Sequence, residues 1–197
     1  YGAAFGAAGE TAGFSILQTC LLSLLLFSGA SQFAVVGIMG AGGSAISAIA
    51  TATLLGFRNA LYGIQMAPIL KVTGIKRILS AQITIDESTA VATLQENDSD
   101  RRRGFYVTGI GVYVFWNLFT YLGALGASAI GDPAAWGLDA AVPAAFCGLV
   151  WPRIKKKREF LITAAAIALA LLLTPIAPAG VPIITTVILA VIFGWKK

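Results

Sequence analysis

The chain has 197 residues, of which 57% are hydrophobic and only 12% are charged. Soluble domains carry about 25% charged residues, so this chain lacks the charge to cover a globular surface, and we expect a lipid bilayer to be its solvent. The net charge of +5 does not indicate nucleic-acid binding, because Lys and Arg fall in short clusters between apolar runs, as in the cytoplasmic loops of membrane proteins.

The first residues are small and apolar, with Gly2 and Gly6 at a spacing that lets helices approach closely. The chain opens on Tyr rather than Met, and no signal peptide is visible. We therefore expect that the N-terminus is incomplete and that residues 1–8 are the end of a helix.

Residues 16–39 form the first complete apolar run, and a small and polar stretch, Ser28-Gly29-Ala30-Ser31-Gln32, lies at its mid-depth. One interpretation is a packing notch against a neighbouring helix, with the Ser hydroxyls bonded to the preceding turn. The other is a broken helix whose freed backbone groups face a substrate cavity. The composition does not favour one over the other.

Residues 44–70 form an apolar run long enough to cross a bilayer as a helix, with Arg58 near its middle. A guanidinium cannot lose its proton, and at bilayer depth its charge costs at least about 2.5–3.5 kcal/mol. Asp86-Glu87 is the only close acidic pair later in the chain that apolar sequence flanks. We therefore predict that these two stretches meet inside a membrane protein and help form its substrate path. Asn59 and Tyr62 add polar groups near Arg58.

Residues 78–95 have basic clusters at both ends, within 71–77 and at 101–103. If both clusters are cytoplasmic, the segment cannot cross the membrane once, so it re-enters or lies at the interface. A crossing would leave one basic cluster outside. A non-crossing segment is favoured, and a plain amphipathic surface helix is the simpler alternative.

The second half contains a clear span at 104–130, with Tyr106, Tyr113, Trp116 and Tyr121 along it. Aromatic residues at the ends of such a span are interpreted as interface anchors. An acidic outer loop is expected at 131–139. Short apolar runs follow at 140–150, 160–174 and 181–195. The sequence thus predicts an all-α polytopic integral membrane helix bundle of about six to seven transmembrane segments, some of them broken or re-entrant, forming a single transmembrane transport domain over residues 1–197.

The motifs of common enzymes are absent from the sequence. It contains no P-loop, no GxSxG elbow, no HExxH and no His. Cys20 and Cys147 lie in apolar stretches and cannot form a typical zinc site. The side chains of Asp86 and Glu87, about 100° apart on a helix, would not converge simply as a catalytic pair. We expect neither an enzyme nor a cofactor.

Four motifs together resemble the AzlC family of branched-chain amino acid transporters. They are Tyr1-Gly2 with Phe5-Gly6, Ser28 to Phe33, Arg58 to Gly63 with Ala67-Pro68, and Asp86-Glu87-Ser88. Their order and separations also match, most strongly over residues 1–95. The chain departs from common members at Gly56, where Asn is frequent, and at Asn59, where His is frequent. The second change weakens any proton relay through that position.

The resemblance implies a multi-pass protein of the bacterial plasma (inner) membrane that exports valine, leucine, isoleucine and sometimes methionine. It also implies a secondary transporter with a small membrane partner of the AzlD type. A zwitterionic amino acid needs a cation or a helix N-terminus for its carboxylate and acceptors for its ammonium. Arg58 is a candidate for the first role, and Asp86 or Glu87 for the second. The candidate substrate-binding residues are Ser28, Gly29, Ala30, Ser31, Gln32, Arg58, Asn59, Tyr62, Asp86, Glu87 and Ser88.

Three alternatives stay open at this point. An ion pair of Arg58 with Asp86 or Glu87 could do no more than lock two helices together. The chain could be a permease subunit driven by a separate ATPase. It could also be a structural membrane protein with no substrate.

Overall fold

The structure is a computed structural model that describes residues 1–130, 135, 137 and 140–195. Helices make up its regular structure, and no strand occurs in the described part, which confirms the all-α class. The helices are α1 (Gly2–Thr11), α2 (Ile16–Leu25), α3 (Gly29–Gly40), α4 (Ala45–Leu70), α5 (Gly74–Gln82), α6 (Asp86–Thr93), α7 (Asp98–Ile130), α8 (Ala141–Val150), α9 (Lys157–Leu173) and α10 (Val181–Trp195), with a 3₁₀ turn at Trp151–Arg153.

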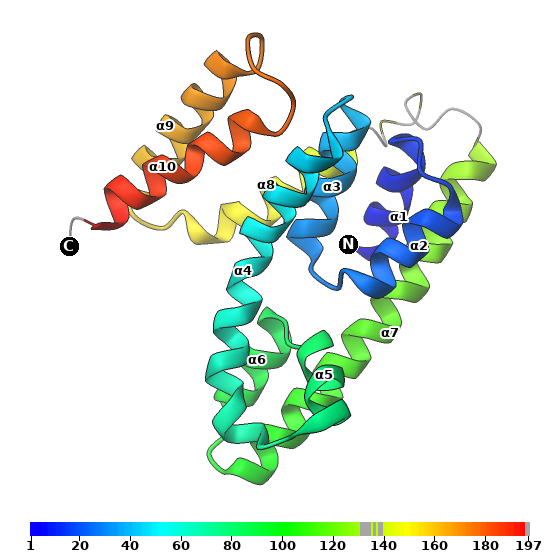
Figure 1. Cartoon of the computed structure of the whole chain (residues 1–197), viewed down its shortest axis with the longest axis vertical. Coiled ribbons are helices and arrows are strands. Elements are labelled where there is room, and N and C mark those ends of the chain that lie inside the picture. Colours follow the sequence, from blue (N-terminus) through cyan, green and yellow to red (C-terminus); the bar gives the residue numbers. More distant parts are fainter. Residues whose placement is uncertain (131–134, 136, 138–139, 196–197) are drawn as a thin grey trace.

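Two long helices, α4 and α7, run along the length of the molecule (Figure 1). The side chain of Arg102 donates a hydrogen bond from Nε to the backbone oxygen of Ile69 at 2.8 Å, which joins the end of α4 to the beginning of α7. Within the described residues, α7 alone is both long and apolar enough to cross a membrane by itself. α4 has 26 residues but carries Arg58 and Asn59 at its centre. The expected six to seven transmembrane segments therefore stay a prediction.

α1 packs against α7 with almost no space between the two backbones. A Cβ atom on Gly6 would lie 2.0 Å from the backbone oxygen of Thr120, and one on Gly123 would lie 2.1 Å from that of Ala3. Phe5, on the same helix, is completely buried and meets Phe33 of α3 edge-on, with ring centroids 5.6 Å apart. The close approach predicted from Gly2 and Gly6 is confirmed, and it positions α3 through this aromatic contact.

The apolar run 16–39 is two helices rather than one, because α2 ends at Leu25 and α3 begins at Gly29. The break that one of the two interpretations predicted is therefore confirmed, and its role in a substrate cavity stays a prediction. Side chains bind the backbone oxygens that the break exposes. Gln32 donates to the oxygen of Leu26 at 2.7 Å, and Gln82 donates to that of Leu24 at 2.8 Å. A helix end inside an apolar protein needs such partners, since unpaired carbonyl groups are costly to bury.

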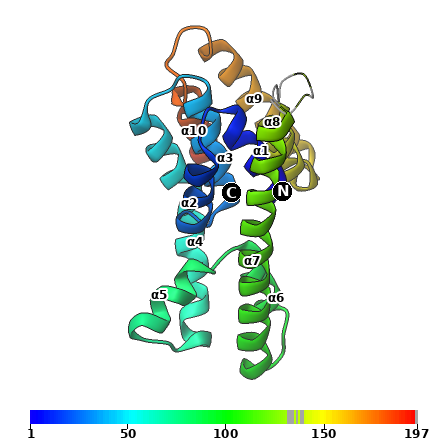
Figure 2. The ribbon, with the colours of Figure 1, turned by 90° about the vertical axis from the view of Figure 1, so that its right-hand side faces the viewer.

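A second break separates α5 from α6, at residues 83–85. With nine and eight residues, neither helix is long enough to span a bilayer. The connection between them passes between α4 and α7 at mid-height of the molecule (Figures 1 and 2). Because α4 ends and α7 begins on the same side, residues 74–93 enter and return on that side. We call residues 74–93 the α5–α6 segment. One uninterrupted helix does not form there, and the expectation that the segment does not cross the membrane stays a prediction.

α9 and α10 form an antiparallel hairpin beside the upper half of the molecule, as Figure 1 shows. Their connecting turn lies against the turn between α3 and α4. A Cβ atom on Gly43 would lie 2.9 Å from the Cβ of Ala179, and one on Gly180 would lie 2.9 Å from that of Ser47. Most of the expected acidic loop at 131–139 lies outside the described residues.

Candidate functional site

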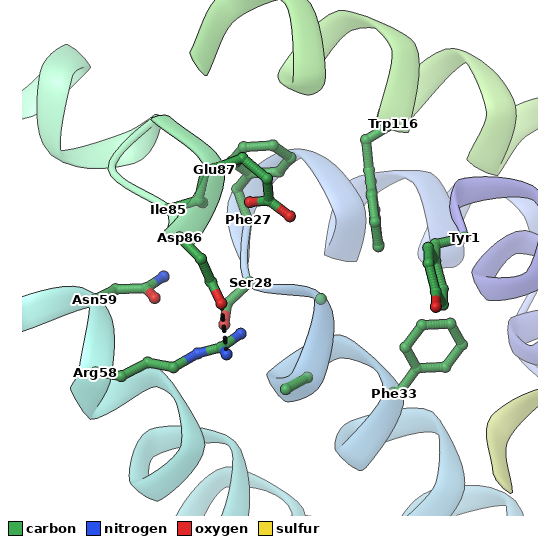
Figure 3. A pocket seen from close by; sticks show the side chains of 12 residues that line it. Tyr1, Phe27, Ser28, Phe33, Arg58, Asn59, Ile85, Asp86, Glu87 and Trp116 are labelled. Carbon is green, nitrogen blue, oxygen red and sulfur yellow. Dashed lines mark hydrogen bonds and ion pairs between the residues drawn. The ribbon is translucent and has the colours of Figure 1, made fainter. Parts of the chain in front are cut away.

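The two helix breaks and the middle of α4 enclose one cavity of about 60 Å³ (Figure 3). Residues 28–30, which are the N-cap and first two residues of α3, line it on one side. Residues 85–87, in the same three positions of α6, line it on another. Arg58 and Asn59 reach it from α4. Three segments that are far apart in the sequence therefore bring their polar residues to one place.

An ion pair crosses this cavity from α4 to α6. Nη1 of Arg58 lies 2.9 Å from Oδ2 of Asp86, and the two side chains are 28% and 30% exposed. The predicted meeting of the two polar stretches is thus confirmed, and Asp86 rather than Glu87 is the partner. Asp86 lies in the first turn of α6, where the helix dipole favours a negative charge.

Several polar groups around the ion pair have no hydrogen-bond partner among the described residues. Nε of Arg58 and Oδ1 of Asn59 are buried without a hydrogen bond. The exposed carboxylate of Glu87 has no ion pair or hydrogen bond with any described residue. Buried polar atoms without partners are rare and costly, and they often mark the position of a ligand or a bound water molecule.

The N-terminus of α3 adds free backbone donors to the same wall. Its N-cap residue, Ser28, makes no side-chain capping hydrogen bond, so the first-turn N–H groups lack an intrahelical partner. The hydroxyl of Ser28 instead lies 3.1 Å from that of Ser31. Free N–H groups at a helix N-terminus bind carboxylates and other anions.

An aromatic wall faces the charged one, formed by Tyr1, Phe33 and Trp116 (Figure 3). Trp116 Nε1 donates to Oε1 of Gln32 at 2.9 Å, which fixes the orientation of the indole ring. A Cβ atom on Gly29 would lie 3.1 Å from that ring. Trp116 lines this cavity, whereas the anchor role was expected only of aromatic residues at the ends of the 104–130 span. Its place in the middle of the 104–130 run, and not at an end, is the signal that could have identified it.

The remaining predicted site residues lie behind the cavity or away from it. Ser31 is buried and donates to the backbone oxygen of Ala52 at 2.8 Å, tying α3 to α4. Gln32 supports the first break, as described above. Ser88 is buried and holds the second break, since its hydroxyl donates to the oxygen of Ile83 at 2.8 Å and accepts from the N–H of Ile85 at 3.1 Å. Tyr62 is half-buried on α4 and does not line the cavity.

The geometry suits a small zwitterion with an apolar side chain. A cation and free N–H groups are available for a carboxylate, a free carboxylate for an ammonium group, and aromatic rings for the side chain. As it stands, a volume of about 60 Å³ accommodates only a few water molecules. A bound amino acid therefore requires the walls to move apart.

The fold and the site define an all-helical membrane protein whose charge-lined cavity lies between broken helices, an arrangement typical of transport proteins. The chain belongs to the AzlC family. The model of this family, which is described as AzlC protein, matches residues 1–130. This is a family of transporters and not of enzymes.

Curated relatives agree with this assignment. The chain is 30% identical to "Inner membrane protein YgaZ" of Escherichia coli strain K12, over 83% of this chain and 70% of that protein. It is 32% identical to an "Uncharacterized membrane protein" of Archaeoglobus fulgidus, over 90% of this chain and 79% of that one. No solved structure matches the chain.

Proposed function

We propose that this chain is the large subunit of a secondary transporter that exports branched-chain amino acids and methionine. In this proposal it is a multi-pass protein of the bacterial inner membrane and acts with a small AzlD-type membrane subunit. Membership in the AzlC family supports the transport role. The observation that carries the substrate class is the cavity itself, where charged groups face an aromatic wall.

Each group of the substrate has a partner in this proposal. The carboxylate binds the guanidinium of Arg58 and the free N–H groups at the N-terminus of α3. The ammonium binds Glu87, the carboxylate that is not engaged by Arg58. The apolar side chain lies between Phe33 and Trp116, whose rings exclude water from it. Charge-assisted hydrogen bonds of this kind contribute about 1.5–3 kcal/mol each, which is enough to select a zwitterion.

Flux measurements in vesicles test the proposal. The protein is reconstituted with and without its small partner, and the vesicles are loaded with labelled valine, leucine, isoleucine or methionine, with and without a proton gradient. We expect saturable efflux of these amino acids and much slower efflux of lysine or glutamate, whose side-chain charge has no partner at the aromatic wall.

The same experiment distinguishes the alternatives. Flux that depends on ATP and a further subunit would indicate an ATPase-driven permease. The absence of specific flux under every condition would contradict the proposal and favour a structural role.

A further inference from the structure

A second, larger cavity lies on the far side of α3 from the ion pair. It has a volume of about 570 Å³ and is bounded by α3, the turn between α9 and α10, and the beginning of α10. The α3 wall consists of Phe33, Ala34, Gly37 and Ile38, and Ala41 lines the cavity just after the helix ends. Ligand pockets commonly measure about 300–1,000 Å³, so this volume is large enough for an amino acid.

Phe33 is the one described residue that lines both this cavity and the ion-pair cavity. It is 1% exposed, and its ring contacts Phe5 edge-on at an interplanar angle of 86°. Figure 3 shows the ring of Phe33 at the end of the ion-pair cavity that is opposite to Arg58. A single aromatic side chain therefore lies between the small charged space and the large apolar one.

Phe33 packs in the core with Phe5, and small residues of α3 lie next to it on the side of the larger cavity. Ala34 and Gly37, in the following turn of α3, have little or no side chain, and both line the larger cavity. A change of χ1 between the staggered positions allowed in a helix would move the ring without any shift of the backbone. The ion-pair cavity would then join the larger one.

We propose that Phe33 is the gate between two stations of one solute path. The ion-pair cavity is the first binding position on this path. The apolar cavity beneath the α9–α10 turn is the second, and the amino acid moves into it after leaving the ion pair. This inference rests on the proposed function. It explains how a cavity of about 60 Å³ transmits a solute that it does not contain in the closed state.

Cysteine labelling tests the gate without any substrate. Cys20 and Cys147 are first replaced by Ser. Ile176→Cys, in the exposed α9–α10 turn, shows from which side of the membrane a polar maleimide reaches this end of the molecule. Ala177→Cys, in the wall of the larger cavity, shows whether that cavity is open to water. Ser28→Cys reports on the ion-pair cavity, where Ser28 is 5% exposed.

We expect Ala177→Cys to react readily and Ser28→Cys to react slowly from that side. Adding Phe33→Ala should raise the labelling rate of Ser28→Cys by about 10- to 100-fold, because an open state of a few per cent becomes the permanent state. Phe105→Ala is the matched control, since it removes a fully buried ring that lines neither cavity. It should leave the labelling rate unchanged. An unchanged rate with Phe33→Ala, or an unreactive Ala177→Cys because lipid fills the cavity, would overturn the gate.

Flux separates the gate from the proposed function. In a wild-type protein that transports valine, Phe33→Ala should give efflux that no longer follows the proton gradient. Phe33→Trp should slow efflux at least about tenfold, because the larger ring raises the barrier between the two cavities. If wild type transports and both variants behave like it, the gate is wrong and the function stands. If wild type transports nothing, the function fails, whatever the labelling shows.

Discussion

Arg58 is the residue on which the site depends, because its charge cannot be removed by proton loss. In the structure Asp86 meets one of its nitrogens at 2.9 Å, and its Nε is buried without a partner. The ion pair therefore leaves part of the hydrogen-bonding capacity of the guanidinium unused. A substrate carboxylate could accept a hydrogen bond from this unpaired nitrogen. An ion pair with a purely structural role would leave the nitrogen without a partner.

The variant Arg58→Ala should abolish transport while most of the protein stays in the membrane. Loss of one charge-assisted hydrogen bond alone weakens binding by roughly 10- to 100-fold. The measurement is the initial rate of valine efflux together with the amount of protein in the membrane fraction. Normal flux would remove Arg58 from the mechanism.

The double variant Arg58→Met with Asp86→Leu separates binding from helix locking. Replacing a partly buried ion pair with apolar residues of similar size often preserves stability. If the pair only locks α4 to α6, this variant should transport normally. We expect a folded protein without transport, measured by thermal unfolding in detergent and by efflux.

Glu87→Gln tests the ammonium partner. Because Glu87 lacks an ion-pair partner among the described residues, its replacement should leave stability within about 0.5 kcal/mol. Loss of the charge should raise KM about tenfold and change kcat less, since a neutral hydrogen bond replaces a charge-assisted one. An unchanged KM would assign the ammonium to another group.

Asp86→Asn affects the same cavity through Arg58. The guanidinium loses its counter-charge, so we expect lower transport activity, measured as valine efflux over a range of pH. Full activity with an unchanged pH dependence would argue against a role of Asp86 in coupling.

At the scale of the elements, two broken helices build the site. Both breaks need side chains that bind the exposed backbone. Gln82, from a distant part of the chain, binds the end of α2, and Ser88, in α6 itself, binds the residues just before that helix. Ser88 and Gln32, which sequence analysis proposed as substrate-binding residues, lie outside the cavity lining and support its walls. Backbone polar groups are tolerated at membrane depth only where protein or a water-filled cavity surrounds them, which accounts for these contacts.

The packing of α1 on α7 offers a prediction with a matched control. Gly6→Ala should destabilise the protein by about 1–3 kcal/mol, because the new methyl group would overlap the backbone of α7 at Thr120. Gly126→Ala, on α7 itself, meets nothing within 4 Å and should be neutral or slightly stabilising. Thermal unfolding in detergent measures both, and equal stability of the two variants would contradict the packing described here.

At the scale of the whole molecule, the α5–α6 segment determines which ends of α4 and α7 share a side. The hydrogen bond from Arg102 to Ile69 places the end of α4 beside the beginning of α7. The basic residues at 71–77 and 101–103 therefore lie at one end of the molecule, as the positive-inside rule expects of cytoplasmic loops. The cluster at 153–158 lies nearer mid-height in Figure 1, so the rule does not place every cluster at one level.

Cysteine labelling of intact cells tests this orientation. In a chain without Cys20 and Cys147, Thr73→Cys and Ser99→Cys, both exposed, should react with a membrane-impermeant maleimide from the same side. If residues 74–93 return to the side from which they enter, both positions must be labelled from that side. Labelling from opposite sides would mean that residues 74–93 cross the membrane.

The sequence by itself determined that the chain lies in a membrane and that Arg58 needs an acidic partner. A chain with 12% charged residues cannot cover a globular surface, and a permanent cation in an apolar run must find an anion. Both properties depend on composition and charge alone. The bounds of α4 also followed from the sequence, because the apolar run 44–70 matches the helix and Ser44 caps its beginning.

Only the tertiary structure decided which carboxylate pairs with Arg58, where the apolar run 16–39 breaks, and which rings line the cavity. Asp86 and Glu87 are adjacent in the sequence, and the angle at which α6 meets α4 selects between them. Trp116 and Phe33 lie 83 residues apart, and their contact with one space depends on how α7 and α3 pack. Such contacts are properties of packed surfaces, and local sequence patterns do not encode them.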